Sequence, residues 1–169
     1  MLEMELESWK RCYVPSLFEA SDGPLILDAG AGEGETLMFY YLLGFRRFRC
    51  VEPDKDCFKR LISNAAKLVD AEVHLFNRRF RTDDVYDVDF AKIDVEGGEI
   101  ELLQADKQKL PREIVVETHG LDVQKLLLES FKLEHLMDRS WFNVKIWRWI
   151  NPVDNDKTRF EVTESSMAG

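Results

Sequence analysis

A glycine-rich turn is the part of this sequence that most clearly could do chemistry. Residues 28–34, with the sequence DAGAGEG, follow an apolar run at 25–27 and precede a helical pattern. Glycines in such a turn let the backbone approach a ligand closely and adopt positive φ, and the following helix offers unpaired amides at its N-terminus. Glu52 lies about 20 residues beyond Gly32, where an acidic side chain that binds ribose hydroxyls is expected. The turn and the acid together predict a site for a ribose-containing cofactor.

Two kinds of cofactor use this arrangement, and the residues favour one of them. A dinucleotide fingerprint, G-x-G-x-x-G, needs a small residue at position 35, where this chain has Glu35. Glu33 and Glu35 would also repel a pyrophosphate at the start of the helix. The other pattern is an acid followed by G-x-G-x-G, which residues 28–34 fit without a gap. It resembles motif I of the class I S-adenosylmethionine-dependent methyltransferases, whose cofactor carries no phosphate. A glycine turn that binds nothing is the remaining alternative.

A second motif makes the resemblance more specific. Residues 92–99 read KIDVEGGE, with TDDV at 82–85 upstream and IVVETH at 114–119 downstream. Together these segments resemble the FkbM-type methyltransferases, and the resemblance runs from about Leu25 to Phe131. The family often has G-A-N-x-G in motif I, where this chain has GAGEG. The segment before the first strand is short, so we expect a small N-terminal substrate cap or none.

The resemblance implies an α/β fold with a Rossmann-like, seven-stranded methyltransferase sheet. The implied strand order is 3-2-1-4-5-7-6, mostly parallel, with a terminal antiparallel hairpin and helices on both faces. The order of progression reverses between the first and fourth strands, and ligands bind outside the carboxyl ends of strands at such a switch point. Asp28, Asp94 and Glu117 come at the carboxyl ends of the first, fourth and fifth expected strands. The fold would therefore gather these acids at the site.

Hydrophobic periodicity, taken by itself, predicts the elements that position these residues. Short apolar runs alternate with helical patterns, which is typical of a parallel sheet covered on both faces. Parallel strands are expected at 25–28, 48–52, 72–76, 90–95 and 113–118, and a hairpin at 133–137 and 144–150. Helices are expected near 2–13, 37–43, 53–65, 99–105 and 123–131, with at most one helical turn in the polar stretch 77–88. We expect one domain over 1–150, with an N-terminal helical segment at 1–20 and a loosely held polar tail at 151–169.

The resemblance implies roles for the cofactor-binding residues. The backbone of Gly30, Gly32 and Gly34 would cradle the methionine part of S-adenosyl-L-methionine. Asp28 would order this loop by accepting hydrogen bonds, or would approach the ammonium group of the cofactor.

Three further residues would hold the nucleoside. Glu52 would accept both ribose hydroxyls, the alternative being a solvated acid that caps the next helix. Pro53 would line the adenine pocket, although it could equally serve only to start that helix. Asn77 could read the edge of the adenine or be an ordinary loop residue.

The catalytic candidates lie in and after the second motif. Asp94 and Glu96 are two residues apart, so on an extended backbone their side chains would point the same way. Methyl transfer is an in-line displacement that depends mostly on positioning, and an alcohol acceptor also loses a proton. Asp94, Glu96 or His119 could be the general base, and Asp94 could instead bind the amino group of the cofactor. We assign no metal ligand, but Asp94, Glu96, Glu117 and His119 could alternatively hold a divalent cation.

Composition limits the classes of partner. Lys and Arg number 23 against 32 Asp and Glu, a net charge of −9, which argues against nucleic acid because such binding depends on cations meeting phosphates. The three cysteines share no C-x-x-C spacing, no apolar run reaches about 18 residues, and the first residues do not resemble a signal peptide. We therefore expect a cytoplasmic protein without a membrane span.

The acceptor is the least determined part of the prediction. The resemblance implies O-methylation of a small molecule or sugar, and arginines at 78, 79 and 81 could receive an acidic or phosphorylated one. An RNA or protein methyltransferase is one alternative, although no [DN]PP[YF] tetrapeptide follows the fourth expected strand. A non-catalytic or partner-dependent module that binds the cofactor is another. A homodimer that supplies a lid would be compatible with O-methylation of a small molecule or sugar.

Overall fold

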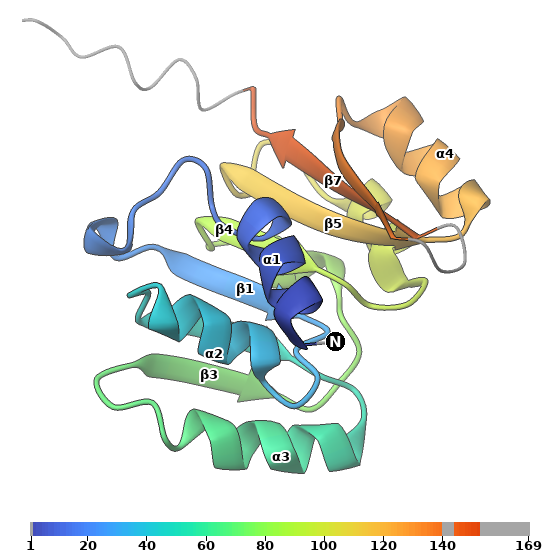
Figure 1. Cartoon of the computed structure of the whole chain (residues 1–169). Helices are drawn as coiled ribbons and strands as arrows, with labels where there is room; N and C mark the ends of the chain where they lie inside the picture. Colours follow the sequence, from blue (N-terminus) through green and yellow to red (C-terminus); the bar gives the residue numbers. More distant parts are fainter. Residues whose placement is uncertain (1, 140–143, 153–169) are drawn as a thin grey trace, which may run out of the picture.

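Seven strands form one sheet in the order β3-β2-β1-β4-β5-β7-β6 (Figure 1). The computed structural model describes residues 2–139 and 144–152. The strands are β1 (Leu25–Ala29), β2 (Arg47–Val51), β3 (Glu72–Phe76), β4 (Phe90–Ile93), β5 (Glu113–His119), β6 (Glu134–Arg139) and β7 (Val144–Ile150). The first five run parallel, and β7 pairs antiparallel with both β5 and β6. The expected strand order and terminal hairpin are confirmed.

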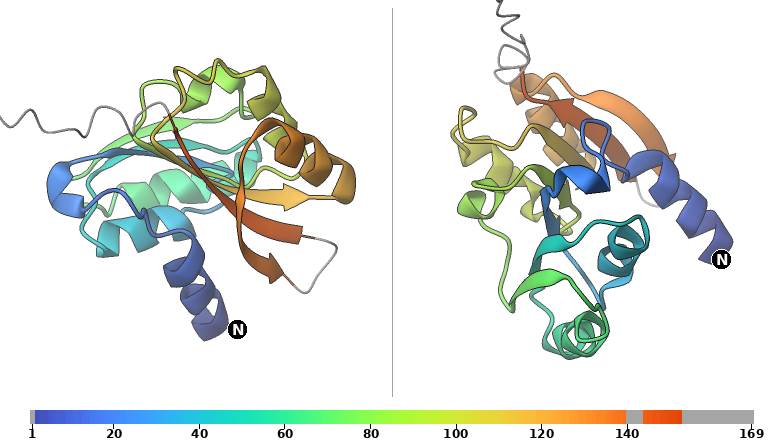
Figure 2. Two further views of the ribbon diagram at one scale, coloured as in Figure 1. Left: turned by 90° about the horizontal axis from the view of Figure 1, so that it is seen from above. Right: turned by 90° about the vertical axis from the view of Figure 1, so that its left-hand side faces the viewer.

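Helices cover both faces of the sheet (Figure 2). The α-helices are α1 (Leu2–Cys12), α2 (Glu35–Leu42), α3 (Lys55–Ala65) and α4 (Leu121–Ser130), and short 3-10 helices are η1 (Ala20–Asp22), η2 (Thr82–Val85) and η3 (Gly98–Gln104). The core has two parts. Ile26, Phe48 and Phe90 pack with α1, α2 and α3 on one face, and Leu27 and Ile93 pack with η2, η3 and α4 on the other. Strand residues alternate between the two faces, as the pleat requires.

The fourth strand is shorter than the sequence suggests. It ends at Ile93 rather than at Val95, because the chain then turns through two residues in the left-handed region, Glu96 with φ 44° and Gly97 with φ 93°. The expected helix at 99–105 is a 3-10 helix that starts at Gly98. Asp94 and Glu96 therefore do not share an extended backbone, and the expectation that their side chains point the same way loses its basis.

The N-terminal segment packs on the same face of the sheet as α2. The Trp9 ring lies 5.9 Å from the ring of Phe39. After α1 the chain crosses to the start of β5, where the buried carboxylate of Glu113 accepts hydrogen bonds from the amides of Ser16 (2.8 Å) and Leu17 (3.1 Å). Arg148 on β7 pairs with the same carboxylate at 2.9 Å. The helix expected near 2–13 is thus present and docked on the domain.

The expectation of a loosely held polar tail at 151–169 falls mostly outside the described residues, which end at residue 152. Residues 140–143, between β6 and β7, also lie outside them. Among the described helices, none is both long and apolar enough to cross a lipid bilayer.

Candidate functional site

A cleft of about 770 Å³ opens at the carboxyl ends of β1, β2 and β4. Its position is the switch point of the sheet, because the chain leaves β1 toward β2 on one side and β4 lies on the other. The volume falls in the range of pockets that bury small ligands. Of the residues singled out in the sequence, Gly30, Gly32, Glu52, Pro53, Asp94 and Glu96 line this cleft.

The glycine loop is held where only a glycine fits. Gly30 has φ 74°, and a Cβ built on it would lie 1.7 Å from the backbone oxygen of Asp94. Its amide donates to the carbonyl of Val51 at 2.9 Å. The loop after β1 is therefore pressed against the turn after β4 and tied to the end of β2. Gly34, with φ 100°, is the N-cap of α2 and lies outside the cleft lining.

Glu52 follows β2 and ties the glycine loop to the start of α3. One carboxylate oxygen accepts from the amide of Gly32 and the other from the amide of Asp54, both at 2.8 Å. The side chain is buried but reaches the cleft. Asn77 is not on the cleft wall. Its amide group donates to the carbonyls of Glu52 (2.9 Å) and Pro53 (3.2 Å) and so holds the backbone that presents the acid.

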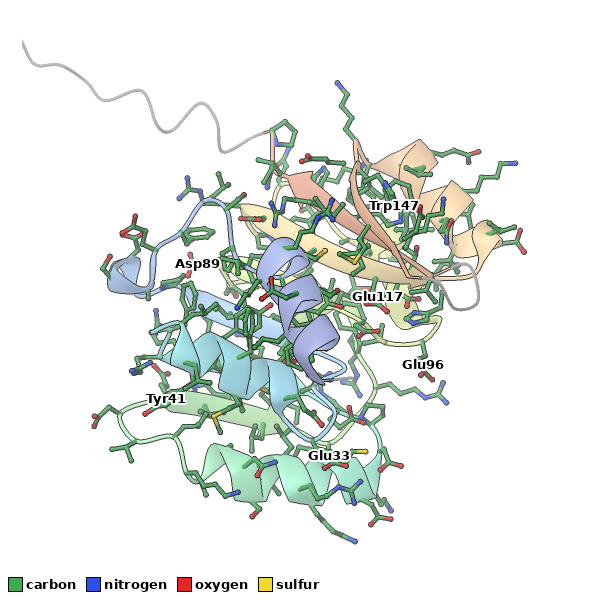
Figure 3. The ribbon with its side chains drawn as sticks, in the orientation of Figure 1. Glu33, Tyr41, Asp89, Glu96, Glu117 and Trp147 are labelled. Atoms are coloured by element: carbon green, nitrogen blue, oxygen red, sulfur yellow. The ribbon has the colours of Figure 1, made fainter. Side chains whose placement is uncertain are left out.

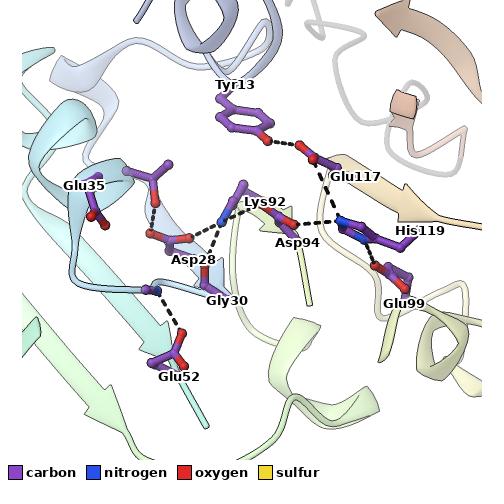
Figure 4. A network of polar contacts seen from close by, with 12 residues as sticks. Tyr13, Asp28, Gly30, Glu35, Glu52, Lys92, Asp94, Glu99, Glu117 and His119 are labelled. Carbon is purple, nitrogen blue, oxygen red and sulfur yellow. Dashed lines mark hydrogen bonds and ion pairs between the residues drawn. The ribbon is translucent and has the colours of Figure 1, made fainter. Parts of the chain in front are cut away.

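Beneath the loop lies a buried ion pair between neighbouring strands (Figure 4). Asp28 on β1 and Lys92 on β4 are register partners, and their Oδ1 and Nζ atoms are 3.0 Å apart. The other Asp28 oxygen accepts from the Thr36 hydroxyl on α2 at 2.5 Å, and Lys92 also donates to the carbonyl of Gly30 at 2.9 Å. Burial by itself would lower the pKa of Lys92, but nearby carboxylates, Asp28 foremost, outweigh it and raise that pKa.

A second polar cluster lies at the ends of β4 and β5. His119 Nδ1 is 2.7 Å from the carboxylate of Glu99 on η3, which is fully buried. Its Nε2 faces Asp94 at 3.7 Å and Glu117 at 3.9 Å. The hydrogen bond to Glu99 raises the pKa of His119 against the opposing effect of partial burial, and Asp94 adds to the rise. Tyr13, at the end of α1, donates its hydroxyl to Glu117 at 2.5 Å.

The catalytic candidates thus separate in space. Asp94 lines the cleft and also faces His119, so it joins the cofactor cleft to the second cluster. Glu96 is exposed and points outward, whereas Glu117, a residue of β5, is buried (Figure 3). Of the three arginines, Arg79 lines the cleft, whereas Arg78 is committed to the buried Asp84 at 2.5 Å.

Sequence reasoning did not place Lys92, Tyr13 or Glu99 in the site. Lys92 left a signal, since it is a charge inside the apolar run FAKI and a buried strand rarely tolerates an unpaired charge. Tyr13 gave none, because its spacing reads as the apolar face of a helix. Glu99 lies in a 3-10 helix, and the sequence does not show that its side chain turns inward to His119.

The fold matches that of solved methyltransferases, at identities that establish the fold alone. Fibrillarin from Aeropyrum pernix, with natively bound S-adenosyl-L-methionine, is 14% identical and superposes with a TM-score of 0.62 over 88% of this chain and 74% of its own. An RNA methyltransferase from Salinibacter ruber, in complex with S-adenosyl-L-homocysteine, is 16% identical, with a TM-score of 0.59 over 89% of each chain. Precorrin-6y C5,15-methyltransferase from Geobacter metallireducens GS-15 is 20% identical, with a TM-score of 0.56 over 75% and 80%.

The sequence matches no family model and no curated protein. The three-dimensional likeness therefore stands alone: the chain has the Rossmann-like fold of the class I methyltransferases.

Proposed function

We propose that this chain binds S-adenosyl-L-methionine in the cleft at the ends of β1 and β4 and transfers its methyl group to an acceptor. The glycine loop carries this proposal, because Gly30 packs against Asp94 so closely that a side chain is excluded, and Glu52 fixes the next turn through the Gly32 amide. Such a loop at the switch point of this fold presents backbone groups, and an acid beside them, to a ribose-containing ligand. The same fold with this cofactor or its product in the neighbouring structures supports the assignment.

Each cofactor contact is assigned from its place in the cleft. Gly30 and Gly32 would face the methionine part, and Glu52 would accept the ribose hydroxyls with the lone pairs that its two backbone donors leave. Pro53 lines the cleft beside Glu52, in position for the adenine.

The other expected contacts would support the cleft without touching the cofactor. Asp28 and Gly34, at the two ends of the glycine loop, would anchor it to β1 and α2, and Asn77 would act through the backbone of Glu52 and Pro53.

The acceptor would enter from the side of Asp94. The hydroxyl oxygen of the acceptor would form the new bond to the methyl carbon as the carbon–sulfur bond of the cofactor breaks, leaving S-adenosylhomocysteine. The hydroxyl proton would pass to a group at this edge, where Asp94 on the cleft wall and His119 behind it are the candidates. Glu96 is also on the wall, at its exposed rim.

A small molecule or sugar is the acceptor that we favour. The KIDVEGGE block resembles that of FkbM-type enzymes, and the net charge of −9 disfavours a polyanion. The neighbours include enzymes described as acting on RNA and on precorrin-6y, so RNA is the second acceptor class to be tested. Incubation with labelled cofactor and, separately, polyols, RNA and protein would separate these acceptor classes. Cofactor binding without transfer to any of them would favour a non-catalytic module.

Removing the acid of Glu52 is expected to weaken cofactor binding. In Glu52→Ala the Kd for S-adenosylhomocysteine should rise about tenfold to a hundredfold, because hydrogen bonds to a charged group contribute about 1.5–3 kcal/mol and the Gly32 amide loses its partner. Calorimetric titration measures this, with NADH as the control ligand. Asp56→Ala, which removes an exposed acid from the first turn of α3, should leave the Kd unchanged. Equal affinity of Glu52→Ala and wild type, or preference for NADH, would count against the proposal.

A further inference from the structure

The geometry points to a binding site for a divalent cation formed by Asp94, Glu117 and His119. One ligand atom from each residue lies within 4.8 Å of the others. The imidazole nitrogen is 3.7 Å from the Asp94 oxygen and 3.9 Å from the Glu117 oxygen. These separations are too long for hydrogen bonds. Two ligands that each bind one metal at about 2.1–2.2 Å lie roughly 3–3.6 Å apart. The two imidazole–carboxylate separations exceed this by a few tenths of an ångström. The two carboxylate oxygens, which lie within 4.8 Å of each other, would approach by up to about 1–2 Å to share a cation.

Each of the three residues has its other polar atom engaged or faced by a separate group (Figure 4). His119 Nδ1 is held by Glu99 at 2.7 Å, and Glu117 Oε2 accepts from the Tyr13 hydroxyl at 2.5 Å. Asp94 Oδ2 faces Lys92 Nζ at 3.8 Å. These outer contacts hold the three side chains with one ligand atom of each within 4.8 Å of the others.

Glu99 is the observation that distinguishes this cluster from an ordinary group of acids. Its carboxylate is fully buried, and within the described residues its Oε2 has no hydrogen-bond partner. A buried carboxylate on the far nitrogen of a histidine is the usual outer partner of a metal-bound imidazole, since it fixes the tautomer and strengthens the ligand. Three carboxylates surround His119, whereas the nearby Lys92 is shared with Asp28.

The donor set indicates the class of ion. Two carboxylate oxygens and one imidazole nitrogen suit a first-row divalent ion such as Mn²⁺ better than Ca²⁺, which prefers oxygen alone. Three protein ligands leave coordination positions for water or a substrate oxygen. Asp94 also lines the cleft, so the ion would stand beside the acceptor. If the proposed function holds, His119 would then be a ligand rather than a base, and the ion would lower the pKa of an acceptor hydroxyl whose proton leaves to water.

Mn²⁺ titration of the cofactor-free protein tests the site, followed by calorimetry and by the electron paramagnetic resonance of the free ion. Wild type should bind one equivalent saturably, and His119→Ala should bind at least about a hundredfold more weakly. Glu99→Gln changes only the partner of His119 Nδ1 and should lower the affinity for Mn²⁺ about tenfold to a hundredfold. His74→Ala is the matched control, because His74 also faces a carboxylate, Glu72 at 2.9 Å, but on the exposed surface. Its Mn²⁺ affinity should stay within twofold of wild type.

Equal Mn²⁺ binding by wild type and His119→Ala, or no saturable binding by wild type, would overturn the inference. S-adenosylhomocysteine binding and thermal unfolding, measured on the same samples without metal, report whether each variant is folded. If His119→Ala does not fold, Glu117→Gln removes one ligand charge at the same site and takes its place. Mn²⁺ binding without S-adenosylhomocysteine binding would leave the cation site standing and remove the cofactor assignment. S-adenosylhomocysteine binding without saturable Mn²⁺ binding would leave the cofactor assignment standing and overturn the cation site.

Discussion

Gly30→Ala is expected to abolish cofactor binding and to lower the free energy of unfolding by about 4 kcal/mol or more. The new methyl group would lie 1.7 Å from the backbone oxygen of Asp94, so either the loop after β1 or the turn after β4 must move. Either movement breaks the hydrogen bonds from the loop to Val51 or the contact of Lys92 with the Gly30 carbonyl. Both parts of the cleft wall would be displaced together.

Gly23→Ala separates the clash from the cost of positive φ. Gly23 has φ 67°, close to that of Gly30, but nothing lies within 4 Å of a Cβ built there. Gly23→Ala should therefore lower the free energy of unfolding only by the cost of placing alanine in the left-handed region, about 1–2 kcal/mol. Its affinity for S-adenosylhomocysteine should equal that of wild type. Urea unfolding and calorimetric titration of both variants measure the difference. Similar losses of stability and affinity in Gly30→Ala and Gly23→Ala would mean that Gly30 is not closely packed.

Lys92→Met is expected to lower the free energy of unfolding by about 3–5 kcal/mol, the usual cost of leaving one member of a buried ion pair alone. Lys92 and Asp28 are almost fully buried, at 2% and 0% exposure, so water cannot replace the lost partner. The carbonyl of Gly30 would lose its donor at the same time. Chemical denaturation at neutral pH measures the effect.

A double-mutant cycle with Asp28→Asn identifies the cause. If the loss in Lys92→Met comes from an uncompensated carboxylate, the double variant should be more stable than the sum of the single changes by about 1 kcal/mol or more. Additive effects would instead assign the loss to packing of the lysine stem. Lys125→Met, which removes an exposed lysine from α4, should change stability by less than about 0.5 kcal/mol.

The sequence predicted the parts of the site that depend on local pattern. The glycine turn, the acid after the second strand and the strand order all follow from periodicity, motif spacing and family resemblance, and Asp28 and Asp94 do come at the ends of neighbouring strands. What each carboxylate binds could not be predicted. Glu52 holds the amide of Gly32, and Glu99 holds His119, through contacts between segments that only the folded chain brings together.

Backbone conformation accounts for the other differences. Nothing local announces that Glu96 adopts positive φ, a conformation that non-glycine residues seldom take. The turn there ends the fourth strand early and moves Glu96 to the rim of the cleft. Likewise, Lys92 stands out in the sequence as a charge inside an apolar run, but only the pairing of β1 with β4 places it opposite Asp28.

The carboxylates of β5 also bear on the order in which the chain is assembled. Tyr13 meets Glu117 across 104 residues, and Ser16 meets Glu113 across 97. Closing loops of that length costs entropy before any contact repays it. During synthesis the N-terminal segment emerges first, yet its partners exist only after β5 has been made. We therefore expect its docking to follow the formation of β5, which would make the contact between Tyr13 and Glu117 one of the later contacts to form.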